Sequence, residues 1–136
     1  MTIIEKALDF ATKKHEGQTD KSGQPYILHP VAVASILGTI SEDENLVAAA
    51  FLHDTLEDTN TTYDELVSEF NEDIANLVQE VTKLKVHGKK LFPMLRTRRG
   101  IVLKFADRLH NLNRMVDQPE EFQKRYLAES TFWKSL

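Results

Sequence analysis

Residues 45–58 read NLVAAAFLHDTLED, and this stretch decides the fold class. Its first half is apolar on nearly every side, which is typical of a helix buried in the centre of a domain. Its second half carries a histidine and three carboxylates within two helical turns, at His53, Asp54, Glu57 and Asp58. Buried carboxylates are costly unless a cation compensates them, so the stretch predicts a central helix with a cation site towards its end. Taken alone, the His53-Asp54 pair is more often a helix cap or a salt-bridge partner.

Helical patterns also fill the sequence before this stretch. Apolar residues at helical spacing from Ile3 to Ala11 predict an amphipathic helix up to about His15. Residues 17–26 read GQTDKSGQPY, which is rich in turn formers and predicts a loop. A second helix, apolar on most sides, is expected to begin at Pro30, because proline suits the first position of a helix.

The sequence after the central stretch continues the helical pattern. Thr62 and Asn71 are suitable N-caps, and they predict helices over YDELVSEF and EDIANLVQEVTKL. Residues 85–93 contain glycine and proline breakers and predict a loop. Residues 101–115 predict a strong helix, and a last helix is expected to begin at Pro119. No run with a period of two is long enough for a sheet. We therefore expect an all-α, single-domain bundle of about six or seven helices, with a natural or a truncated C-terminal end.

Composition limits the classes of function. The 136 residues suffice for one domain over residues 1–136, and 41% hydrophobic with 28% charged residues is typical of a globular protein. The net charge of −4 argues against nucleic acid as the main partner. Without cysteine the chain has no disulfide, thiolate zinc site or cysteine nucleophile. No stretch predicts a membrane span or a signal peptide, so we expect a cytoplasmic protein.

Two further residues join His53 and Asp54 as candidate metal ligands. His29 precedes Pro30, and a residue before proline is pushed away from helical geometry, so His29 is expected at a junction between an extended segment and a helix. Asp107 lies within FADRLHNL, although a single mid-helix aspartate is more often a salt-bridge partner. Together these residues offer two imidazoles and two carboxylates.

This set of ligand types indicates metal-assisted hydrolysis. Mixed nitrogen and oxygen ligands suit a divalent metal such as Mn, Fe, Zn or Mg. Metal-bound water is a nucleophile near neutral pH. Glu57 and Asp58, one turn beyond the His53-Asp54 pair, are suitably placed to orient such a water or to move its proton.

The order H…HD…D resembles the HD superfamily of metal-dependent phosphohydrolases. More narrowly, GQTDKSGQPYILHP, FLHDTLEDT and FADRLHNL resemble the hydrolase domain of the RelA/SpoT family and its small single-domain relatives. The resemblance implies an HD-type helical fold and removal of the 3′-pyrophosphate from (p)ppGpp, the alarmone of the stringent response, with manganese (Mn²⁺) as the typical metal. The matching metal ligands are His29, His53, Asp54 and Asp107. The matching catalytic acids are Glu57 and Asp58.

Other matches concern the nucleotide. The resemblance implies that Lys21 and Ser22 line the nucleotide pocket and that Asn111 contacts the nucleoside. The chain departs from the family at Asp20, where an arginine expected to stack on guanine is usual. The segment before the FADRLHNL helix is also shorter than usual. It contains three arginines that form either a solvated helix face or a phosphate-facing wall: Arg96, Arg98 and Arg99.

Three functions remain open at this point. The first is a (p)ppGpp 3′-pyrophosphohydrolase, and the second is a phosphatase for another nucleotide, such as NADPH or a 2′- or 3′-phosphorylated one. The third is a non-catalytic nucleotide-sensing module, which the complete set of ligands and acids disfavours. Each predicts a small-molecule nucleotide as partner, without nucleic acid or membrane. His15, His87 and His110 are expected to be structural or exposed, and the apolar Phe132 and Trp133 suggest a homodimer contact.

Overall fold

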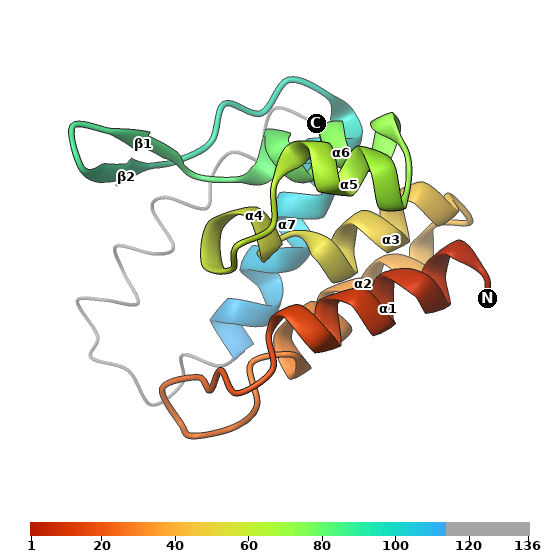
Figure 1. Cartoon of the computed structure of the whole chain (residues 1–136), viewed down its shortest axis with the longest axis horizontal. Coiled ribbons are helices and arrows are strands. Elements are labelled where there is room, and N and C mark those ends of the chain that lie inside the picture. The colour runs from red at the N-terminus through yellow and green to blue at the C-terminus, as the bar shows by residue number, and fades with distance from the viewer. Residues whose placement is uncertain (114–136) are drawn as a thin grey trace.

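Helices make up most of residues 1–113, the part of the chain that the computed structural model describes (Figure 1). They are α1 (Ile3–Lys14), α2 (Leu28–Ile40), α3 (Glu44–Leu52), α4 (Thr55–Asp58), α5 (Tyr63–Glu69), α6 (Glu72–Val81) and α7 (Arg98–Asn113). A hairpin of β1 (Leu84–Val86) and β2 (Lys89–Leu91) connects α6 to α7 in the chain order. The predicted helical-bundle class is confirmed, while the helix predicted from Pro119 and the suggested homodimer contact lie outside the described residues.

The central helix of the bundle is α3, as its sequence predicts. Every residue from Leu46 to Leu52 is buried. The helices α1, α2 and α6 all pack against it (Figure 1). Three consecutive alanines, Ala48 to Ala50, leave room for these neighbours to approach closely. The end of α3 is thereby held in the interior, and His53 follows directly after it.

Side-chain caps set the beginnings of α5 and α6. Thr62 accepts a hydrogen bond from the backbone N–H of Glu65, and Asn71 accepts one from that of Ile74, so both predicted caps are confirmed. Caps of this kind contribute about 1 kcal/mol each. The second of these helices ends at Val81, earlier than its sequence pattern predicts, because the chain then enters β1.

Two predictions about the backbone near the candidate ligands are wrong. Residues 45–58 do not form one helix, because the helix breaks at Asp54, which has φ −100° and ψ 0°. This conformation lies in the sparsely allowed bridge region, where many active-site residues are found. His29 does not lie at an extended junction, because α2 already begins at Leu28. Pro30 is tolerated there, since the first N–H groups of a helix have no intrahelical partner.

The segment expected to be a loop, residues 85–93, contains most of the hairpin instead. β1 and β2 pair in antiparallel fashion, with Leu84 opposite Leu91. His87 and Gly88 connect them with φ values of 51° and 79°. Two positive φ values in a two-residue connection are typical of a type I′ turn, whose twist matches that of paired strands. The prediction that no sheet forms is therefore wrong, although the sheet has only two strands in the described residues.

Candidate active site

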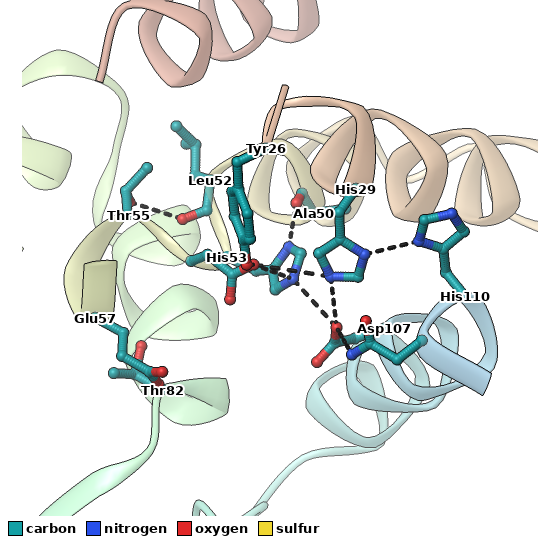
Figure 2. A network of polar contacts seen from close by, with 12 residues as sticks. Tyr26, His29, Ala50, Leu52, His53, Thr55, Glu57, Thr82, Asp107 and His110 are labelled. Carbon is teal, nitrogen blue, oxygen red and sulfur yellow. Dashed lines mark hydrogen bonds and ion pairs between the residues drawn. The ribbon is translucent and has the colours of Figure 1, made fainter. Parts of the chain in front are cut away.

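The four side chains predicted as metal ligands converge in the interior. His29 Nε2 lies 2.8 Å from Asp107 Oδ1 and 3.8 Å from Asp54 Oδ2. His53 Nε2 lies 3.1 Å from Asp54 Oδ2 and 3.5 Å from Asp107 Oδ1. Figure 2 shows His29, His53 and Asp107 pointing toward one another from α2, the end of α3 and α7. Both imidazoles thus direct the same ring nitrogen, Nε2, at both carboxylates.

The donor set fits a divalent metal. Donor atoms of His29, His53 and Asp107 all lie within 4.8 Å of one another, and the three residues are buried. His53 Nδ1 donates to the backbone carbonyl of Ala50 over 2.6 Å, so Nε2 carries the lone pair of the neutral ring. Within residues 1–113, this buried Nε2 has no hydrogen-bond partner. A buried imidazole lone pair facing two carboxylates is suited to a shared cation.

The charges around the cluster keep its acids ionised. Burial opposes the charge of Asp107, but His53, a hydrogen bond with His29 and the Lys104 ammonium outweigh it and hold the pKa of Asp107 well below its usual range. Burial also opposes the charge of Asp54, yet His53 lowers the pKa of that carboxyl as well. In turn, the two carboxylates raise the pKa of His53 well above its ordinary value despite its burial. A metal that binds Nε2 would therefore displace the proton that the metal-free ring holds there. Ionised carboxylates are the form that binds a metal.

Two residues that the sequence did not indicate support the candidate ligands. The Tyr26 hydroxyl donates to Asp54 Oδ2 over 2.6 Å. Burial and the nearby Asp54 raise the pKa of Tyr26 far above its ordinary value, so the phenol remains a donor. The buried Lys104 ammonium donates to Asp107 Oδ2 over 3.1 Å. The spacing of three residues on one helix could have identified Lys104, whereas no local signal links Tyr26 to Asp54.

The end of α7 also reaches the cluster. Asn111 Nδ2 donates to Asp107 Oδ1 over 3.2 Å, and its predicted contact with a nucleoside stays a prediction. His110, which was expected to be structural or exposed, is half-buried and places its Nδ1 2.7 Å from the Nδ1 of His29. Two residues of α7, His110 and Asn111, therefore contact the candidate ligands His29 and Asp107.

The two acids beyond the ligands lie in different surroundings. Glu57 Oε1 accepts a hydrogen bond from the backbone N–H of Lys83 over 3.3 Å, and its Oε2 lies 3.4 Å from Lys90 Nζ on β2. Burial raises the pKa of Asp58, and the carboxylates of Asp54 and Glu57 raise it further. Asp58 is therefore suited to take up a proton, while Glu57 is held toward the hairpin.

The loop that carries Lys21 and Ser22 is ordered by Asp20. Asp20 Oδ1 accepts hydrogen bonds from the backbone N–H and the hydroxyl of Ser22 and from the N–H of Gln24. Gly23 takes the positive φ of 84° in this turn. Lys21 and Ser22 are both exposed. The loop geometry gives Asp20 a structural role, and the nucleotide contacts of its neighbours stay predictions.

The arginine cluster does not act as one surface. Arg99 Nη2 lies 2.6 Å from Asp73 Oδ2, and its Nε lies 3.1 Å from Asp43 Oδ2. These ion pairs join α7 to the N-terminal ends of α6 and α3. Arg96 and Arg98 are exposed. The pairing of Arg99 favours a structural role for it over a phosphate-facing one.

The chain is similar to several curated proteins over nearly all of its own length. It is 39% identical to a guanosine-3′,5′-bis(diphosphate) 3′-pyrophosphohydrolase of Aquifex aeolicus, over 93% of the chain and 20% of that protein. It is 39% identical to a probable GTP pyrophosphokinase of Mycobacterium leprae, over 96% of the chain and 18% of that protein. It is 37% identical to the bifunctional (p)ppGpp synthase/hydrolase SpoT of Escherichia coli, over 93% of the chain and 20% of that protein. The chain spans about a fifth of the length of the curated relatives it matches.

A solved structure, described as a metazoan ortholog of SpoT that hydrolyzes ppGpp and plays a role in starvation responses, has the same fold. Its TM-score with this chain is 0.80 at 26% sequence identity, and the match covers 98% of this chain and 84% of that one. These relatives confirm the resemblance to the RelA/SpoT hydrolase domain. A family model described as HD domain matches residues 7–91, more than half of the sequence. The chain therefore belongs to the HD domain family.

Proposed function

We propose that this chain hydrolyses the 3′-pyrophosphate of guanosine tetra- and pentaphosphate alarmones, (p)ppGpp, in a metal-dependent reaction. The observation that carries the proposal is the convergence of two imidazoles and two carboxylates beside a second pair of acids, Glu57 and Asp58. The names of the bacterial relatives and of the solved SpoT ortholog support the choice of substrate. The domain proposed for this activity spans residues 1–136.

The proposed cofactor is one divalent metal, Mn²⁺. Its proposed ligands are His29, His53, Asp54 and Asp107. A divalent ion there would supply a Lewis acid that offsets phosphate charge and makes water a nucleophile near neutral pH. The supporting hydrogen bonds from Tyr26 and Lys104 would keep the two carboxylates oriented toward it.

The two remaining acids are proposed to manage the water and its proton. The raised pKa of Asp58 suits it to accept a proton as the water oxygen forms its bond to phosphorus. The bond between that phosphorus and the 3′-oxygen breaks, and the proton that Asp58 took from the water is returned to the leaving 3′-oxygen, which restores the Asp58 carboxylate. Glu57 is proposed to orient the water, since its carboxylate is already held in place by two groups of the hairpin segment.

The proposed partner is a small-molecule nucleotide. Its proposed contacts are Lys21 and Ser22 on the loop and Asn111 on α7. Among the described helices, none combines the length and apolar character that a membrane span requires. The cytoplasmic location stays a prediction from the sequence.

A nucleotide panel tests the proposed substrate. Purified metal-loaded protein is incubated with ppGpp, with NADPH and with 2′- and 3′-phosphorylated nucleotides, and the released pyrophosphate and phosphate are measured. We expect pyrophosphate from ppGpp and a product that keeps its 5′-phosphates. Phosphate released from another nucleotide, without reaction of ppGpp, favours the broader phosphatase. Binding without turnover of any nucleotide favours a sensing module.

A set of variants tests the proposed metal ligands. His53→Ala and Asp107→Ala are expected to lose the bound metal, because each removes one donor from the cluster. Asp64→Ala serves as the control, since Asp64 is an exposed aspartate on α5. Metal content is measured after gel filtration. Wild-type metal stoichiometry in both ligand variants would show that the site is wrong.

A further inference from the structure

The ring of His29 is contacted at both of its nitrogens by residues of α7 (Figure 2). Asp107 Oδ1 lies 2.8 Å from Nε2, and His110 Nδ1 lies 2.7 Å from Nδ1. The ring planes of His29 and His110 differ by 23° and their centroids are 5.0 Å apart, so with this short nitrogen contact the rings lie edge to edge, as a hydrogen bond in the ring plane requires. Since His110 is three residues beyond Asp107, both side chains occupy the same face of the helix. One face of α7 thus contacts both ring nitrogens of His29.

A contact between two Nδ1 atoms at this distance holds a single hydrogen, so one ring donates and the other accepts. A metal on His29 Nε2 requires the lone pair at that nitrogen. The proton of the neutral His29 ring then lies on Nδ1, and His29 is the donor. His110 must accept, so its own proton lies on Nε2. His53 reaches the same tautomer differently, by donating its Nδ1–H to the carbonyl of Ala50.

We propose that His110 is a positioning residue that fixes the tautomer and the ring orientation of His29 for metal binding. The proposal rests on the metal site of the proposed function, but not on the identity of the substrate. Metal-bound histidines usually donate their second N–H to a carboxylate, a backbone carbonyl or water, and loss of such a partner typically costs 10–100-fold in metal affinity. Here the acceptor is a second imidazole, which accepts at Nδ1 in only one of its two neutral tautomers.

The opposite arrangement, in which His110 donates the hydrogen bond to His29, predicts different proton positions on both rings. If His110 Nδ1 carried the proton, His29 would accept at its own Nδ1 and hold its proton on Nε2. That proton would point to Asp107 Oδ1, 2.8 Å away, and would block Nε2 as a ligand. The tautomer of His110 in the metal-loaded protein therefore separates the two arrangements.

Two substitutions at His110 distinguish the effect of its hydrogen-bond acceptor from the effect of its ring. In His110→Asn, the side-chain oxygen takes nearly the position of Nδ1 and accepts the same hydrogen bond. In His110→Leu, nothing accepts. We expect His110→Leu to raise the Kd for Mn²⁺ by roughly 10–100-fold. The Kd of His110→Asn is expected to stay within a few-fold of the wild-type value. His87→Asn is the matched control, because His87 is exposed in the hairpin turn and asparagine tolerates its positive φ.

The Kd for Mn²⁺ is measured by competition with a chelating indicator, and metal-free melting temperatures show whether each variant is folded. Nitrogen-15 NMR of the histidine rings reports the tautomers directly, and we expect the metal-loaded wild type to carry the His110 proton on Nε2. Wild-type affinity in His110→Leu, an equal loss in His110→Asn, or a proton on His110 Nδ1 overturns the proposal. A wild-type protein that binds no metal overturns the metal site as well. Normal metal binding without ppGpp hydrolysis overturns only the proposed substrate.

Discussion

Replacing Tyr26 with phenylalanine is expected to weaken metal binding without unfolding the protein. The change removes one hydroxyl, which donates to Asp54 Oδ2 over 2.6 Å, and keeps the ring. Hydrogen bonds to charged groups contribute about 1.5–3 kcal/mol. Loss of a partner that orients a metal ligand typically costs 10–100-fold in affinity, which corresponds to about 1.4–2.7 kcal/mol. The two ranges overlap, so we expect the Kd for Mn²⁺ to rise by roughly 10–100-fold.

Tyr63→Phe is the matched control for this experiment. The Tyr63 hydroxyl donates to Asn76 Oδ1 over the same distance, 2.6 Å, but it does so on the surface and away from the ligands. The Kd for Mn²⁺ is measured by chelator competition for both variants, and metal-free melting temperatures report any change in folding. An unchanged Kd in Tyr26→Phe, or equal losses in both variants, refutes the reasoning. Tighter binding would show that the phenol competes with the metal for the Asp54 oxygen.

Three other substitutions follow from the structure. Glu57→Gln is expected to lower turnover by about 10²–10⁴-fold while metal content stays constant, and full activity would remove Glu57 from the mechanism. Asp20→Arg is expected to lower the KM for guanine alarmones by about tenfold, yet also to lower the melting temperature, because three hydrogen bonds to Asp20 are lost. Unchanged KM values for guanine and adenine substrates would exclude the loop as the base pocket. Arg99→Gln is expected to lower the free energy of unfolding by less than about 1 kcal/mol, since its ion pairs are screened by solvent. Arg99 depresses the pKa of Asp73, so this stabilisation is present at neutral pH and is lost as the pH falls through that lowered pKa. Denaturant unfolding of Arg99→Gln and wild type at neutral and strongly acidic pH measures this loss of stability. A raised KM for the nucleotide in Arg99→Gln would instead support the phosphate-facing interpretation of Arg99.

Signals that act over a few residues allowed much of the fold to be predicted. The caps at Thr62 and Asn71 each reach an N–H only three residues away, and the structure contains both. The central position of α3 was predicted because a helix that is apolar on all sides has to be buried, and α3 is buried from Leu46 to Leu52. The turn at His87 and Gly88 was missed because the usual signal for a type I′ turn is Asn-Gly or Asp-Gly. Histidine nevertheless belongs to the residues enriched at positive φ, and the turn uses that tolerance.

The candidate ligands could be predicted because residue type and order identify them, whereas their supporting contacts depend on tertiary structure. Tyr26 and Asp54 are 28 residues apart, and His29 and His110 are 81 apart. No local pattern reports a pairing over such distances. Lys104 is different, because it is three residues from Asp107 on one helix face and its burial gives it a reason to pair.

The break at Asp54 explains how a histidine and an aspartate adjacent in sequence can serve one site. In a continuous helix, neighbouring side chains point about 100° apart. Here the chain leaves the helical path at Asp54, and His53 Nε2 and Asp54 Oδ2 approach to 3.1 Å. The same break redirects the following turn, so Glu57 contacts Lys83 and Lys90 of the hairpin segment. The hairpin lies in the segment that the resemblance to the RelA/SpoT hydrolase domain predicts to be shorter than usual. Changes in it should therefore alter how Glu57 handles water, while the ligands held by α2, α3 and α7 keep their geometry.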